Sequence, residues 1–118
     1  MTMLSSFSAY RALTPQNRRT VADMHSFRDR QIRKLVDHAY RNVPFYTRLF
    51  DSAAINPRDI RGAADLERIP VTTRDDIQNA SLADRLARGT DPAKLIARKT
   101  TGSSGQCLVV MRTWREEQ

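Results

Sequence analysis

The chain has 118 residues and a mass of 13.5 kDa, which leaves room for one domain. Hydrophobic residues make up 40% of it and charged residues 28%, a balance typical of folded rather than disordered chains. The longest apolar run, from Cys107 to Met111, is far shorter than the roughly 20 residues of a membrane-spanning helix, so we expect no membrane span. Cys107 is the single cysteine, which excludes an internal disulfide and a thiolate zinc site and suits a cytoplasmic protein.

Positive charge is concentrated in the first half of the chain. The formal net charge is +7; residues 1–50 carry nine basic and three acidic side chains, whereas residues 51–118 carry eleven and ten. A basic half of this kind suits a nucleic acid, an anionic lipid surface or an acidic ligand, although a solvated face is the more common explanation. One hypothesis is therefore a small basic helical module that binds nucleic acid or an acidic protein partner.

The first half of the sequence predicts two helices that meet at a proline. Ser26 and Asp29 predict a capped helix start, and apolar residues then recur at helical spacing as far as Val43. Pro44 is expected to end this helix and to open the next one. The side chains expected to face inward, including an aromatic group expected to form core, are Ile32, Leu35, Val36, Ala39, Tyr40, Val43, Phe45, Tyr46, Leu49 and Phe50.

Residues 54–94 predict short helices separated by breaks. Prolines and a glycine leave room for single turns around 57–60 and 63–68. Thr72 and Thr73, followed by two acids, predict a capped helix from about 74 to 88. Gly89 is expected to end this helix, and Asp91-Pro92 predicts one more N-cap and first turn. The residues expected to face inward from the 74–88 helix are Ile77, Leu82 and Leu86.

The last part of the sequence predicts a β-hairpin. Residues 95–99 suit a short strand, and residues 107–112 suit a buried strand because they form a bounded, partly β-branched apolar run. Cys107 is expected to be a small buried side chain, and His38 on the first helix is expected to serve packing or capping. Thr113 and Glu116 resemble a helix start at which the sequence stops, so we expect a truncated domain.

The segment between the predicted strands has the composition of an anion-binding loop. It reads Thr100-Thr101-Gly102-Ser103-Ser104-Gly105, and Arg98 and Lys99 precede it. Two glycines allow consecutive backbone N–H groups to converge on an anion, and four hydroxyls add donors. Such a loop suits a polyphosphate, although this composition is more often a flexible connection. Its spacing fits neither a Walker loop nor a dinucleotide fingerprint.

Three segments that occur in order resemble adenylate-forming enzymes, the acyl-CoA synthetase superfamily. The loop is similar to that superfamily's Thr/Ser-Ser-Gly-Ser/Thr-Thr-Gly loop. Upstream, His38-Ala-Tyr-Arg-Asn-Val-Pro-Phe-Tyr-Thr-Arg-Leu-Phe50 and Leu66-Glu-Arg-Ile-Pro-Val-Thr-Thr-Arg-Asp-Asp76 resemble the phenylacetate–coenzyme A ligase branch, which includes relatives encoded with capsular polysaccharide biosynthesis genes. The resemblance covers about residues 25–118, and the ordered set is more specific than the loop alone.

The resemblance implies a part of an ATP-dependent carboxylate–coenzyme A ligase, with ATP, Mg²⁺, coenzyme A and a carboxylic acid as its ligands. In that family the loop closes over the β- and γ-phosphates of ATP while the carboxylate attacks the α-phosphate. Carried over to this sequence, the phosphate-contacting positions are Thr101, Gly102, Ser103, Ser104 and Gly105, with Thr100 at the start of the loop. No catalytic residue and no metal ligand is assigned. Many members have proline where this chain has Cys107, so its loop exit is expected to be less rigid.

The expected fold class is α/β, and α+β in the part of the domain that the sequence covers. We expect a poorly ordered N-terminus over residues 1–24, a helical region over 25–94, and the start of an ATP-binding sheet with its phosphate loop over 95–118. The resemblance places the family's adenine contacts, acyl pocket and C-terminal domain downstream of the loop. We therefore expect 118 residues to be inactive alone, unless a second chain supplies the missing part. Nucleic-acid binding is the less favoured alternative, because the aromatic residues are better explained as core than as a stacking surface.

Overall fold

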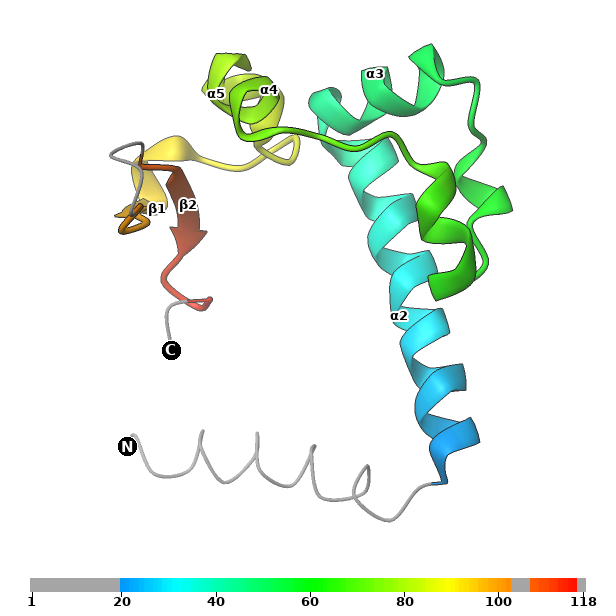
Figure 1. Ribbon diagram of the computed structural model, residues 1–118. Coiled ribbons are helices and arrows are strands. Elements are labelled where there is room, and N and C mark those ends of the chain that lie inside the picture. The colour runs from blue at the N-terminus through cyan, green and yellow to red at the C-terminus, as the bar shows by residue number, and fades with distance from the viewer. Residues whose placement is uncertain (1–19, 103–106, 117–118) are drawn as a thin grey trace, which may run out of the picture.

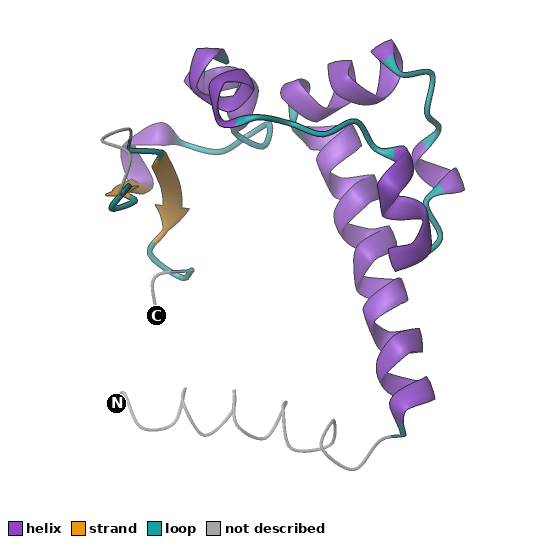
Figure 2. Ribbon diagram, viewed as in Figure 1, coloured by secondary structure: helices purple, strands orange, loops and turns teal. Residues whose placement is uncertain are grey.

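The computed structural model describes residues 20–102 and 107–116, in which helices are followed by one β-hairpin (Figures 1 and 2). The mixed helix-and-strand class expected from the sequence is confirmed. The order of elements is α2 (Val21–Asn42), α3 (Pro44–Ser52), the 3₁₀ helices η2 (Pro57–Asp59) and η3 (Ala63–Arg68), α4 (Arg74–Asn79), α5 (Leu82–Arg85), the 3₁₀ helix η4 (Pro92–Lys94), β1 (Leu95–Lys99) and β2 (Val109–Thr113).

Helix α2 begins five residues before the predicted start. Thr20 is its N-cap: the Thr20 hydroxyl accepts from the Asp23 backbone N–H at 3.2 Å, and the Asp23 carboxylate accepts from the Thr20 backbone N–H at 3.0 Å. This reciprocal capping box satisfies two backbone donors that the helix leaves free. The prediction that Ser26 and Asp29 cap the helix is therefore wrong, because a stronger cap lies one and a half turns earlier.

The Asp29 carboxylate joins α2 to η3 instead. It accepts from the Ala63 backbone N–H at 3.2 Å, and the Arg33 guanidinium on the next turn donates to the Arg61 carbonyl at 2.9 Å. The Ala63 N–H, followed by Arg28, holds the pKa of Asp29 below its ordinary value of 3.8. Gly62 is buried at this contact, where an added Cβ would lie 2.6 Å from the Asp29 carboxyl carbon. Because glycine has no Cβ, the backbone at Gly62 can lie close to Asp29, and η3 can approach α2.

The corner between α2 and α3 forms at Pro44, as the sequence predicts. Val43 is extended, with φ −111° and ψ 107°, and serves both as the C-cap of α2 and as the N-cap of α3. Pro44 occupies the first turn of α3, where its missing N–H costs nothing. The turn brings Phe50 back to Tyr40, with ring centroids 6.0 Å apart in an edge-on arrangement. The prediction of two helices joined at Pro44 is confirmed.

The core lies where α2, α3 and η2 meet. Phe50 is 2% exposed, Ile60 1% and Val36 7%, and partly buried side chains from α2 and the following loops pack around them. Leu35 was expected to face this core but is 67% exposed. Leu35 lies beside the strip of α2 that α3 and η2 cover. Helical spacing alone therefore placed one residue too many on the inward face of α2. The partly buried side chains are Ile32, Tyr40, Ile55 and Ile69.

The predicted helix from 74 to 88 is two short helices. The chain extends at Ala80, with ψ 140°, and Ser81 then caps α5 by accepting from the Asp84 N–H at 3.2 Å. Serine competes well for free helical N–H groups, so it begins a new helix here. Gly89, with φ +82°, lies in the turn after α5, where the Thr90 N–H donates to the Ala87 carbonyl at 3.0 Å. Gly89 therefore shapes a turn and does not end a long helix.

The short turns and strands are confirmed in outline. The 3₁₀ helices η2 and η3 occupy the predicted single turns, and the Asp91 side chain caps η4 by accepting from the Ala93 N–H at 3.0 Å. Strand β2 begins at Val109, two residues later than predicted. Beyond it, the Glu116 carboxylate accepts from the Thr113 N–H at 2.8 Å in a turn. Within the described part of the chain, no helix has the length and apolar character needed to cross a membrane.

Replacement of Ala54 by glycine is expected to stabilise the protein. Ala54 follows α3 with φ +53°, a left-handed conformation that costs an L-residue roughly 1–2 kcal/mol, and it sits where helices prefer glycine. The greater freedom of glycine in the unfolded chain offsets part of this cost. Ala54→Gly should therefore raise the free energy of unfolding, measured in urea, by roughly 0.5–1 kcal/mol. Ala53→Gly is the matched control, since Ala53 has φ −90°, and it should lose stability. Equal losses in both variants would contradict the prediction.

Candidate functional site

The candidate loop is closed at its base by Thr100. Strands β1 and β2 pair antiparallel with Lys99 opposite Val109, so residues 100–108 connect them. The Thr100 N–H donates to the Leu108 carbonyl at 2.9 Å, and the Thr100 hydroxyl accepts from the Leu108 N–H at 3.0 Å. The backbone and the side chain of Thr100 thus continue the hydrogen bonding between the strands beyond the last residue pair of the hairpin. Thr100 has a structural role at the start of the loop.

The other predicted loop residues divide into two groups. Thr101 is exposed and Gly102 is half-buried at the start of the loop. Ser103, Ser104 and Gly105 lie outside the described residues, so the predicted phosphate contacts at these positions stay predictions. The two basic residues before the loop, Arg98 and Lys99, are both exposed. Because side chains alternate along a strand, they point to opposite faces of the hairpin.

Helix α4 reaches the far side of the same loop. The Gln78 side-chain amide donates to the Cys107 carbonyl at 2.9 Å. Sequence reasoning missed Gln78, because a polar residue on the exposed side of a short helix carries no signal of a contact 29 positions away. Cys107 is exposed, and the prediction of a buried side chain at this position is wrong. The regular strand begins only at Val109, so Cys107 belongs to the loop and not to the apolar strand.

An apolar hollow separates the hairpin from the short helices. It has a volume of about 240 Å³, and Ile77, Leu82 and Leu86 line it together with Leu108–Met111 of the hairpin. Ile77, Leu82 and Leu86 are half-buried, so the prediction that they face inward is confirmed. Arg85 also lines the hollow, and its Nε is buried without a hydrogen-bond partner among the residues that the structure describes.

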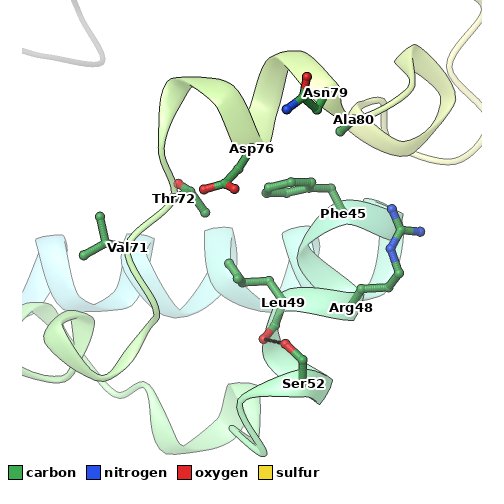
Figure 3. Close-up of a pocket in the computed structure, with 9 residues that line it drawn as sticks. All are labelled: Phe45, Arg48, Leu49, Ser52, Val71, Thr72, Asp76, Asn79 and Ala80. Atoms are coloured by element: carbon green, nitrogen blue, oxygen red, sulfur yellow. Dashed lines mark hydrogen bonds between the residues drawn. The ribbon is translucent and has the colours of Figure 1, made fainter.

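A larger groove lies between α3 and α4. It has a volume of about 500 Å³, and Figure 3 shows Phe45 and Leu49 of α3 facing Thr72 and Asp76 across it. Asp76 completes a capping box with Thr73, whose N–H and hydroxyl lower the pKa of Asp76. The interpretation of Asp76 as a helix cap is confirmed. Because its carboxylate accepts from Thr73, Asp76 serves the helix end and not acid–base chemistry in the groove.

A two-bond ion pair holds α5 on α3. Arg48 Nη2 lies 2.9 Å from Asp84 Oδ2, and Arg48 Nη1 donates to Asp84 Oδ1 at 3.1 Å. The Arg48 guanidinium, followed by the Ser81 hydroxyl, holds the pKa of Asp84 below its ordinary value. Nothing in the sequence pairs these residues, since they lie 36 positions apart. The ion pair thus joins α3 to α5, the helix that follows α4 in the chain.

His38 contacts a neighbouring side chain on its own helix. His38 is exposed on α2, where the Asn42 side-chain amide lies 3.1 Å from its Nδ1 and 3.0 Å from its carbonyl oxygen. The Asn42 amide, and not the His38 ring, satisfies the carbonyl in this contact, so a packing or capping role of His38 stays a prediction. In residues 20–102 and 107–116, no three His, Cys, Asp or Glu side chains are grouped so that they could hold a metal ion.

Comparison with known proteins gives one consistent result. No protein-family model matches the chain. Three curated relatives do, and each is a phenylacetate-coenzyme A ligase. The chain is 31% identical to that of Escherichia coli over 100 residues, which are 83% of this chain and 22% of the relative. It is 38% identical to that of Thermus thermophilus over 56 residues, 48% of this chain and 13% of the relative, and 27% identical to that of Aromatoleum evansii over 106 residues, 88% and 23%.

The three relatives show that the chain is similar to coenzyme A ligases. More narrowly, it is similar to phenylacetate-coenzyme A ligases over most of its length, and the resemblance expected from the motifs is confirmed. The chain spans about a fifth of the length of the Escherichia coli and Aromatoleum relatives. The alternative of a basic nucleic-acid-binding module is not favoured.

The stability that Asp84 contributes should disappear in acid. The pKa of Asp84 is lower in the folded protein than its ordinary value of 3.8. Ionised Asp84 therefore stabilises the fold fully at pH values above 3.8, and this stabilisation is lost as the pH falls through the lower pKa of the folded state. At pH 7, Asp84→Asn should unfold at lower urea than the wild type, and the two should converge as pH falls below 3.8. Asp75→Asn is the matched control on the exposed side of α4. A gap between wild type and Asp84→Asn that persists unchanged in acid would contradict the prediction.

Proposed function

We propose that the chain is the N-terminal portion of an ATP-dependent carboxylate–coenzyme A ligase. The observation that carries the proposal is its similarity to the Escherichia coli phenylacetate-coenzyme A ligase over 83% of this chain. The order of the three sequence motifs, which resembles the start of this family, supports the N-terminal position. A cytoplasmic location and an association with polysaccharide biosynthesis belong to the same proposal.

The role of Thr101–Gly105 in this proposal is to bind the β- and γ-phosphates of ATP. The bound substrate carboxylate attacks the α-phosphorus, pyrophosphate leaves, and the thiol of coenzyme A then displaces AMP from the acyl-adenylate. Loop N–H groups and hydroxyls provide fixed donors for the charge that moves onto pyrophosphate. A hairpin whose base is held by Thr100 supports this role, because a loop with fixed ends loses less freedom on binding.

Mg²⁺ is compatible with the residues that this part of the ligase provides. Magnesium keeps several waters and binds mainly to substrate phosphates with one or two carboxylates. The described residues contain no acidic cluster that would form a complete protein cage. In the proposal, the metal therefore accompanies the triphosphate. The chain is proposed to be inactive alone, since it corresponds to 22% of the Escherichia coli relative.

Loss of two loop hydroxyls should weaken ATP binding. If Ser103 and Ser104 donate to phosphate oxygens, the double variant Ser103→Ala/Ser104→Ala loses hydrogen bonds to charged groups, each worth roughly 1.5–3 kcal/mol. The dissociation constant for Mg·ATP, measured by isothermal titration calorimetry, should rise at least roughly tenfold. Ser26→Ala on the exposed side of α2 is the matched control and should leave the constant unchanged. Equal affinity in all three proteins would remove the loop from the proposal.

The size and activity of the native product test the function directly. An antibody against the α2 segment is expected to detect a product several times larger than 13.5 kDa on an immunoblot. That product, once purified, should exchange pyrophosphate into ATP when a suitable carboxylic acid from a panel is present. A native product of 13.5 kDa that is a stable monomer without nucleotide affinity would overturn the proposal.

A further inference from the structure

One peptide group at the exit of the loop is held on both sides. The carbonyl of Cys107 accepts from the Gln78 side-chain amide at 2.9 Å, and the N–H of the same peptide unit, on Leu108, donates to the Thr100 hydroxyl at 3.0 Å. Because a peptide unit is planar, two hydrogen bonds at its opposite edges fix the orientation of the plane. The exit of the loop is therefore restricted at Cys107.

The two hydrogen bonds come from different parts of the fold. Thr100 belongs to the hairpin, whereas Gln78 extends from α4, which begins at the Thr73–Asp76 capping box. The apolar surfaces on either side leave a hollow of about 240 Å³. Apolar packing is non-directional, so it leaves the orientation of the loop exit to polar contacts such as the Gln78 hydrogen bond.

We propose that Gln78 is a positioning residue for the loop: by holding the Cys107 carbonyl, it keeps the loop exit in the conformation that binds a triphosphate. The inference rests on the proposed function for its ligand, but not for the restriction of the exit. Proline would restrict this exit covalently in many members of the family that the chain resembles. Here the exit residue is Cys107, and the hydrogen bond from α4 supplies a restriction that its backbone lacks.

The Leu108 amide provides the measurement, because its N–H lies in the same peptide unit as the Cys107 carbonyl and donates to the Thr100 hydroxyl. In the full 118-residue chain, Gln78→Met removes the donor while it preserves charge and approximate side-chain length. The rate at which the Leu108 N–H exchanges with solvent deuterium should rise about fivefold, the change expected from loss of one ordinary hydrogen bond. Gln31→Met on the exposed side of α2 is the matched control and should leave this rate unchanged. Circular dichroism checks that both variants retain the helices.

A second readout separates this inference from the proposed function. The dissociation constant for Mg·ATP should rise about fivefold in Gln78→Met and stay constant in Gln31→Met. Faster exchange of the Leu108 amide in Gln78→Met, without any ATP binding by the wild type, would reject the proposed ligand and support restriction of the loop exit by Gln78. A wild-type exchange rate of the Leu108 amide in Gln78→Met would overturn the positioning role, whatever the affinity for ATP.

Discussion

The turn at Val43–Pro44 is the constraint on which the rest of the fold depends. Because proline cannot continue α2, the chain turns a corner and places Phe50 against Val36 and Ile60. The same corner directs Arg48 toward Asp84, and their ion pair holds α5 on α3. Helix α4, immediately before α5, is then near enough to the hairpin for Gln78 to reach Cys107. A local backbone restriction thus extends, contact by contact, to the candidate loop.

The sequence predicted the features that depend on neighbouring residues. Proline breaks, the 3₁₀ turns, the capping role of Asp76 and the antiparallel hairpin are all local, and the structure confirms them. Helix limits were less accurate, since Thr20 outcompetes Ser26 as an N-cap and Ser81 divides a segment that periodicity alone would join. Cys107 was misplaced because its apolar neighbours suggested a strand that begins two residues later.

Contacts between distant residues lay beyond sequence reasoning. The Asp29–Ala63, Arg48–Asp84 and Gln78–Cys107 pairs join segments between 29 and 36 positions apart, and no spacing rule relates their members. Of these three contacts, the Gln78–Cys107 hydrogen bond reaches the loop directly. The motifs identified the loop by its composition and order, whereas its restraints became visible only in three dimensions. The role of Thr100 shows the same difference, since its hydroxyl serves the base of the hairpin.

The backbone hydrogen bond between Arg88 and Asn42 has a consequence for amide exchange. The Arg88 N–H donates to the Asn42 carbonyl at 2.7 Å, so a residue in an exposed turn satisfies one of the free carbonyls at the end of α2. Turn amides ordinarily exchange with solvent deuterium quickly. This one can exchange only when the turn after α5 separates from the end of α2. A single proton in an irregular segment therefore measures how often the two parts of the protein move apart.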